Sequence, residues 1–142
     1  MARKIMIVAL LLLIGCKSSP IIKHPLNLED MTPLEFLIHL ESDHNKGDCY
    51  YIRFVTGGWV KEEHLPHLFD LIDSDEKCTL PVFFASSPHV DMGDGSTVGR
   101  EAGFLIKNYM GQRYPAPLGS RLSDADKKEL RKWWKEYRKK GG

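Results

Sequence analysis

Two histidines with neighbouring carboxylates form the pattern in this sequence that is best suited to chemistry. His64 and His67 are three residues apart and follow Glu62 and Glu63. Histidines at that spacing share one side of a helix, where their ring nitrogens can bind zinc. Further zinc ligands would have to come from elsewhere, and the candidates are His39, His44 and His89. The alternative is an ordinary surface with histidines beside glutamates, and we expect no cofactor.

A second pattern is the loop "VDMGDGSTVGRE", which is rich in glycine, acidic and hydroxyl residues. Backbone amides around Gly93, Gly95, Ser96 and Thr97 could bind an anion at the start of the following helix. The loop lacks the lysine of a Walker motif, and glycines occupy positions where an EF-hand needs oxygen ligands. These departures favour the alternative, a turn followed by a helix cap.

A third pattern is the basic C-terminal segment, "DKKELRKWWKEYRKKGG". Its cations lie at helical spacing beside aromatic residues, and contact with anionic lipid headgroups or wall polymer is one interpretation. The residues of that interpretation are Lys128, Arg131, Lys132, Lys135 and Arg138. The alternative is structural, because acidic residues early and basic residues late in a helix complement its dipole. Leu130, Trp133, Trp134 and Tyr137 would then form the buried stripe of that helix.

No familiar catalytic motif accompanies these patterns. The chain contains neither a Gly-x-Ser-x-Gly elbow nor a His-Glu-x-x-His zinc motif. We therefore predict no catalytic residues. A small envelope hydrolase, with His64 and His67 or the loop at residues 91–101 at its centre, is kept as an alternative.

The N-terminus indicates where the protein is located. Residues 5–15 are an apolar run of eleven residues behind Arg3 and Lys4. As a helix the run would be about 16 Å long, whereas a bilayer core is about 30 Å thick, so this layout is typical of an export signal. The sequence Leu13-Ile14-Gly15-Cys16 resembles the lipobox of bacterial lipoproteins. The resemblance implies lipid transfer to the Cys16 thiol, cleavage before it and acylation of the new N-terminus, giving an extracytoplasmic protein anchored to a membrane of the cell envelope.

The two remaining cysteines form an even pair once Cys16 carries lipid. In an oxidising compartment we expect Cys49 and Cys78 to form a disulfide. Closing a loop of about 30 residues would stabilise the fold by about 3 to 4 kcal/mol in the loop-entropy model. A nucleophilic or metal-binding thiol is the alternative, but neither cysteine has CxxC or CxxH spacing.

Helical periodicity organises the chain after the anchor. We predict helices at residues 33–44, 60–72, from 98 to a stop at Gly111, and from Ser123 onward, with Thr32 and either Ser96 or Thr97 as caps. Residues 50–56 suit a strand or a buried helix, and the apolar segment from Thr79 suits a brief buried helix.

These elements predict an all-α fold, with paired helices in a HEAT-like or small irregular bundle and possibly one short strand pair. Residues 59–118, with "GWVKEEHLPHLFDLIDS" followed by "STVGREAGFLIKNYM", resemble HEAT-type helical repeats, which implies a binding surface. The expected organisation is a signal peptide at 1–15, a lipidated cysteine and tether at 16–30, and a single helical domain at 31–142.

Charge excludes one class of partner. Removing Arg3 and Lys4 from the 20 basic residues leaves 18 against 19 acidic ones, a formal charge of −1. That balance and export together argue against nucleic acid as a partner. We expect a lipid-anchored extracytoplasmic binding module that contacts the membrane through its anchor and another envelope protein through its domain. An immunity or inhibitor protein fits that class, and a structural envelope lipoprotein is a further alternative.

Overall fold

A computed structural model describes residues 28–43, 50–53, 55, 57–83 and 95–141. In chain order the elements are η1 (Leu28–Asp30), α1 (Pro33–Asp43), β1 (Tyr50–Ile52), η3 (Glu62–His64), α2 (Leu65–Leu71), β2 (Lys77–Cys78), β3 (Pro81–Phe83), β4 (Ser96–Thr97), α3 (Val98–Tyr109) and α4 (Asp124–Lys139). The predicted signal peptide, its lipobox and most of the predicted tether lie outside the described residues.

Side-chain caps start the helices where the sequence predicts. The Thr32 backbone N–H donates to Glu35 Oε2 at 2.7 Å, and the Glu35 N–H donates to Thr32 Oγ1 at 3.2 Å, which completes a capping box for α1. Thr97 accepts from the Arg100 N–H at the start of α3, and Ser123 accepts from the Asp126 N–H at the start of α4. These contacts confirm the predicted helix starts.

The remaining predicted segments differ from the structure in part. The helix expected over residues 60–72 begins as the 3₁₀ turn η3, and its α-helical part, with Pro66 in the first turn, is the short α2. Residues 50–52 form strand β1, which pairs in parallel with β3. The prediction of a brief buried helix from Thr79 is therefore wrong for residues 81–83, because hydrogen bonding to β1 holds them extended. Strands β2 and β4 form a second, antiparallel pair.

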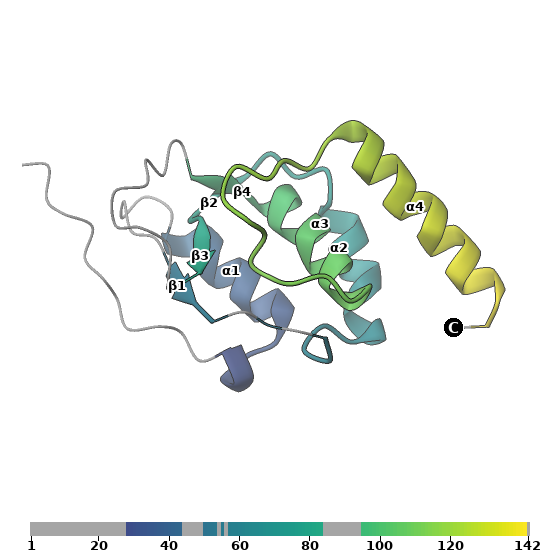
Figure 1. The fold of residues 1–142 in the computed structure, drawn as a ribbon, viewed down its shortest axis with the longest axis horizontal. Helices are drawn as coiled ribbons and strands as arrows, with labels where there is room; N and C mark the ends of the chain where they lie inside the picture. The colour runs from purple at the N-terminus through teal and green to yellow at the C-terminus, as the bar shows by residue number, and fades with distance from the viewer. Residues whose placement is uncertain (1–27, 44–49, 54, 56, 84–94, 142) are drawn as a thin grey trace, which may run out of the picture.

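The core lies between the first three α-helices. Figure 1 shows α2 and α3 packed side by side, with α1 next to them and β1 and β3 at the opposite end from α4. Each of the three helices contributes fully buried aliphatic or aromatic side chains. These are Phe36 and Leu40 from α1, Leu65 and Leu68 from α2, and Leu105 and Ile106 from α3. The fold is thus mostly helical, as predicted, and the described residues form two short strand pairs where at most one was expected.

The last helix attaches to this core through aromatic side chains. Leu130 is buried, whereas Trp133, Trp134 and Tyr137 are half-buried, so the predicted stripe faces the core without being fully covered. The Trp134 ring stacks on Phe69 of α2, with ring centroids 5.4 Å apart. Within the described residues, no helix combines the length and apolar character needed to cross a membrane.

Candidate functional site

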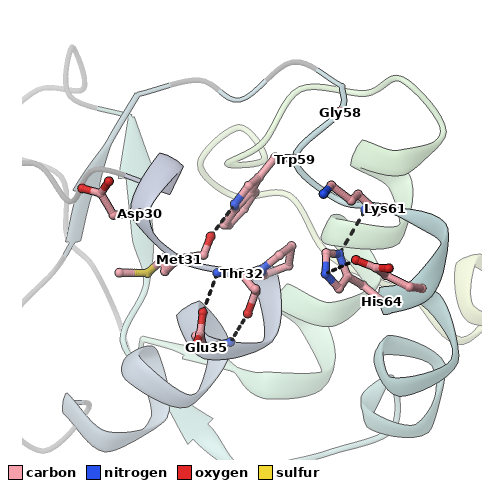
Figure 2. A pocket seen from close by; sticks show the side chains of 10 residues that line it. Asp30, Met31, Thr32, Glu35, Gly58, Trp59, Lys61 and His64 are labelled. Carbon is pink, nitrogen blue, oxygen red and sulfur yellow. Dashed lines mark hydrogen bonds and ion pairs between the residues drawn. The ribbon is translucent and has the colours of Figure 1, made fainter.

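A recess of about 340 Å³ opens between the start of α1 and the segment that leads into η3. Figure 2 shows residues 30–35 on one side of it and residues 58–64 on the other. The two sides come from parts of the chain almost thirty residues apart, so the recess exists only after folding. It is a concave surface lined by both polar and apolar groups, and we take it as the candidate site.

Trp59 joins the two sides of the recess. Its indole N–H donates to the Met31 carbonyl oxygen at 2.9 Å, and its ring meets Phe36 edge-on with centroids 5.6 Å apart. Phe36 belongs to the core, and the Trp59 side chain that contacts it is half-buried. The hydrogen bond and the ring contact fix the indole, so the recess has a rigid aromatic wall before any ligand binds.

The charged groups of the recess are mainly acidic. Asp30, Glu35 and Glu63 supply carboxylates, against a single lysine, Lys61. The Thr32 backbone N–H and hydroxyl lower the pKa of the Glu35 carboxyl, so this group stays anionic into the acid range. The lining therefore favours a cationic group over an anionic one.

The two histidines of the predicted metal site have different environments. His64 is buried in η3, where its Nδ1 accepts from the Lys61 N–H at 3.0 Å, and its Nε2 lies 3.8 Å from Glu63 Oε1. His67 is exposed on α2. His44 and His89 lie outside the described residues, and within the described part no three histidine, cysteine or acidic side chains are grouped to hold a metal. Zinc binding stays a prediction.

The predicted anion loop falls partly on a buried polar cluster. Ser96 Oγ donates to Glu101 Oε1 at 2.5 Å, and Thr97 caps α3. Both hydroxyl groups thus have partners inside the protein, while Gly93 lies outside the described residues. Anion binding stays a prediction, and Thr97 has the capping role of the alternative interpretation.

Glu101 is the centre of that cluster. It is 1% exposed, accepts a hydrogen bond from the Tyr114 hydroxyl at 2.8 Å and pairs with the Arg100 guanidinium. Arg100 in turn donates to the Ser120 carbonyl oxygen at 3.0 Å and 3.2 Å. These bonds tie β4, α3 and the following connector together, so the cluster acts as a structural brace.

Cys78 is a buried free thiol in the structure, whereas its predicted partner, Cys49, lies outside the described residues. Burial raises the pKa of the Cys78 thiol to about 12, and nearby Glu101 adds to the shift. A nucleophilic role is therefore disfavoured for the reduced thiol. The disulfide stays a prediction.

The cations predicted to contact lipid or polymer divide into two groups. Arg131 pairs with Asp73, and the Arg138 guanidinium lies 5.6 Å from the centroid of the Trp134 ring. Lys128, Lys132 and Lys135 are exposed. Arg131 thus ties α4 to the body of the protein, Arg138 packs on its own helix, and the three lysines face solvent.

Sequence reasoning missed both the recess and the buried glutamate. The recess depends on a contact between residues 31 and 59 that no local pattern reveals. Glu101 had a usable signal, because it lies three residues after Val98 and four before Leu105 on the apolar face of α3. A separate pattern, the Ser-x-x-Lys spacing of some serine hydrolases, occurs at Ser74 and Lys77. Lys77 lies in strand β2, however, so the two residues do not lie one turn apart on a helix.

Comparison with known proteins gives no relative to guide assignment of this site. No protein-family model, curated protein or solved structure matches the chain.

Proposed function

We propose that this protein is a lipid-anchored, extracytoplasmic binding module whose recess accepts a basic side chain of another envelope protein. The lipobox at residues 13–16 supports the anchor and the compartment. The observation that carries the binding role is the acidic recess beside the fixed indole of Trp59. An immunity or inhibitor protein, held at the membrane to intercept its target, is the version of this function that we favour.

A guanidinium group matches the lining of the recess in two ways. Carboxylates such as Glu35 and Glu63 accept its N–H groups in charge-assisted hydrogen bonds. The Trp59 indole borders the recess, and a planar cation over its ring would gain about 0.5 to 2 kcal/mol. The volume is near the small end of the range for binding pockets, which suits one inserted side chain better than a large free ligand.

The hydrogen bonds of the lining favour binding over catalysis. The Thr32 hydroxyl accepts from the Glu35 N–H and so caps α1. The Nδ1 atom of His64 accepts from the Lys61 N–H and so caps η3. A hydroxyl and an imidazole engaged in this way hold backbone in place, whereas a nucleophile and its base must contact each other. The recess is therefore preorganised to receive a group.

The binding role is tested by crosslinking in the native cell with variants of the recess. Glu35→Gln with Glu63→Gln removes two negative charges, and glutamine at residue 35 can still complete the capping box. Asp70→Asn with Asp75→Asn removes the same charge from exposed positions outside the recess. We expect capture of one specific protein to fall about tenfold for the recess variant only, the effect of losing a charged hydrogen bond.

The result must then be repeated with purified components. The captured protein should bind the wild type and the Asp70/Asp75 variant equally, and an arginine or lysine on it should be required. Equal capture by all three proteins would exclude the recess as the binding site. Mass spectrometry of the native protein checks the anchor independently, because an unmodified Cys16 with an intact first methionine would contradict it.

A further inference from the structure

The cations of α4 fall into an inner group with partners and an outer group that has none among the described residues. Lys127 Nζ lies 3.6 Å from Asp73 Oδ1, and Arg131 pairs with the same carboxylate. The Arg138 guanidinium lies 5.6 Å from the centroid of the Trp134 ring, and that ring stacks on Phe69 of α2. Lys127 and Arg131 thus help to hold the helix against the body of the protein, whereas Arg138 packs on a side chain of its own helix.

The outer group is a stripe of four lysines, Lys128, Lys132, Lys135 and Lys139. Their spacings of four, three and four residues place them along one face of a helix, roughly opposite Leu130. All four are exposed, and none pairs with a carboxylate in the part of the chain that the structure describes. The stripe is about 16 Å long.

Interactions within the helix balance this stripe only in part. Like charges three or four residues apart on a helix repel and destabilise it, each pair by a few tenths of a kcal/mol. Asp124, Glu129 and Glu136 lie at those spacings from Lys128, Lys132 and Lys139 and offset part of the repulsion, whereas Lys135 has no acidic residue three or four positions away. Lys139 also lies in the last turn, where it complements the helix dipole together with Arg138. An external anion can therefore add to a compensation that the helix supplies incompletely.

We propose that the lysine stripe of α4 lies against the anionic phospholipid headgroups of the membrane that holds the anchor. This inference rests on the membrane location in the proposed function and adds the face that meets the bilayer. Eleven residues lie between Cys16 and Leu28, a reach of at most about 40 Å, so the anchor keeps the domain that carries α4 near the membrane surface.

Three features favour lipid headgroups over an acidic protein. Lysines are mobile point charges, suited to fluid headgroups, whereas a fixed carboxylate pattern is better matched by planar arginines. The stripe carries no large apolar side chain, which a protein interface core would need. A row of lysines within reach of an anionic leaflet contributes about fivefold in partitioning per residue. The contact is thus electrostatic and peripheral.

The test uses lipidated mature protein reconstituted through its anchor into two kinds of vesicle. One kind is phosphatidylcholine alone, and the other contains roughly one third phosphatidylglycerol. The rate at which an amine reagent labels each lysine is read by mass spectrometry. We expect the four lysines to be labelled about fivefold more slowly on the anionic vesicles, and high salt to abolish the difference. Lys77, exposed on β2, should label at the same rate on both.

Matched variants distinguish a contact made by the lysine stripe from a general attraction of the protein to anionic vesicles. Lys132→Gln with Lys135→Gln should remove most of the protection of Lys128 and Lys139, whereas Lys77→Gln with Arg121→Gln, which changes the charge equally at exposed positions, should not. Equal labelling rates on both vesicles, or equal slowing of Lys77, would overturn the proposal. The proposal would also be overturned if the four lysines were labelled freely on both kinds of vesicle but were protected in native envelopes. That result is expected for an acidic protein partner.

Failure of the anchor gives a different result. Protein that does not float with phosphatidylcholine vesicles lacks a working anchor, which contradicts the proposed membrane location. The lysine stripe can still be tested in that case. Flotation with the anionic vesicles alone supports its contact with anionic headgroups, and flotation with neither kind of vesicle overturns that contact.

Discussion

The Tyr114 hydroxyl donates a 2.8 Å hydrogen bond to Glu101 Oε2, and both side chains are at most 1% exposed. Burial raises the pKa of both groups, although Arg100 and Ser96 oppose the shift at Glu101. A titratable carboxyl with three side-chain partners, Ser96, Arg100 and Tyr114, therefore lies inside the core, where its protonation affects folding.

Glu101→Gln should remove a pH dependence of stability. The glutamate of the unfolded chain titrates near 4.5, and burial raises the pKa in the folded protein. The folded state thus binds this proton more tightly, so its stabilisation is complete below about pH 4.5 and is lost as the pH rises through the folded pKa. Denaturant unfolding across this range should show the decline in the wild type but not in the variant.

The control is Glu129→Gln, which changes an exposed glutamate of α4. It should keep the pH profile of the wild type. If the Glu101 variant showed the same decline as the wild type, the carboxyl would have an ordinary pKa in the folded protein.

Cys78 should be unreactive in the reduced, folded protein. Its pKa of about 12, against 9.0 for an exposed thiol, lowers the thiolate fraction roughly a thousandfold at neutral pH. Iodoacetamide labelling of the Cys78 peptide should accelerate at least to this extent on unfolding. The same shift means that its contribution to stability is present below pH 9 and is lost as the pH rises toward 12. Rapid labelling of the native protein would contradict the buried thiol.

Local chemistry explains which parts of the fold could be predicted. Thr32, Thr97 and Ser123 cap helices through residues only three positions away, so their sequence signals are complete. Strand β3 depends instead on pairing with β1, and Tyr50 meets Pro81 across thirty residues. Short apolar runs suit a strand or a buried helix equally, and only that distant partner decides between them.

The candidate site was harder to predict than the helices for the same reason. His64 is visible in the sequence as a possible ligand, but its use as a backbone acceptor depends on the 3₁₀ turn at η3. The lysines of the C-terminal segment are equally visible, yet their division into paired and unpaired groups depends on Asp73, more than fifty residues earlier.

Gly99→Ala should destabilise the protein more than Gly103→Ala, although both replace a glycine inside α3. A methyl group at residue 99 would lie 2.6 Å from the Ser74 carbonyl oxygen and 2.7 Å from that of Ile72, and this backbone cannot easily move. At residue 103 it would meet the flexible side chain of Leu122. Overpacking costs about 1 to 3 kcal/mol, and the better helix propensity of alanine returns about 1.

We therefore expect Gly99→Ala to lower the free energy of unfolding by about 2 kcal/mol or more, and Gly103→Ala by less than about 1. Thermal or denaturant unfolding measures both. Equal losses would show that α2 and α3 do not approach as closely as the structure indicates.

Trp134→Ala should loosen α4 without unfolding the rest of the protein. The Trp134 ring stacks on Phe69 and lies near Arg138, so the variant loses both contacts. A half-buried tryptophan with an aromatic partner contributes about 2 to 3 kcal/mol. Hydrogen exchange should accelerate for amides of α4 while those in the middle of α3 keep their protection, since α3 is buried mainly against α1 and α2. Lys132→Ala, on the outer face of the same helix, should change neither stability nor exchange by more than about 0.5 kcal/mol. If exchange in α3 accelerated as much as in α4, the last helix would be part of a single cooperative unit with the core, and the lysine stripe could not be altered independently of the fold.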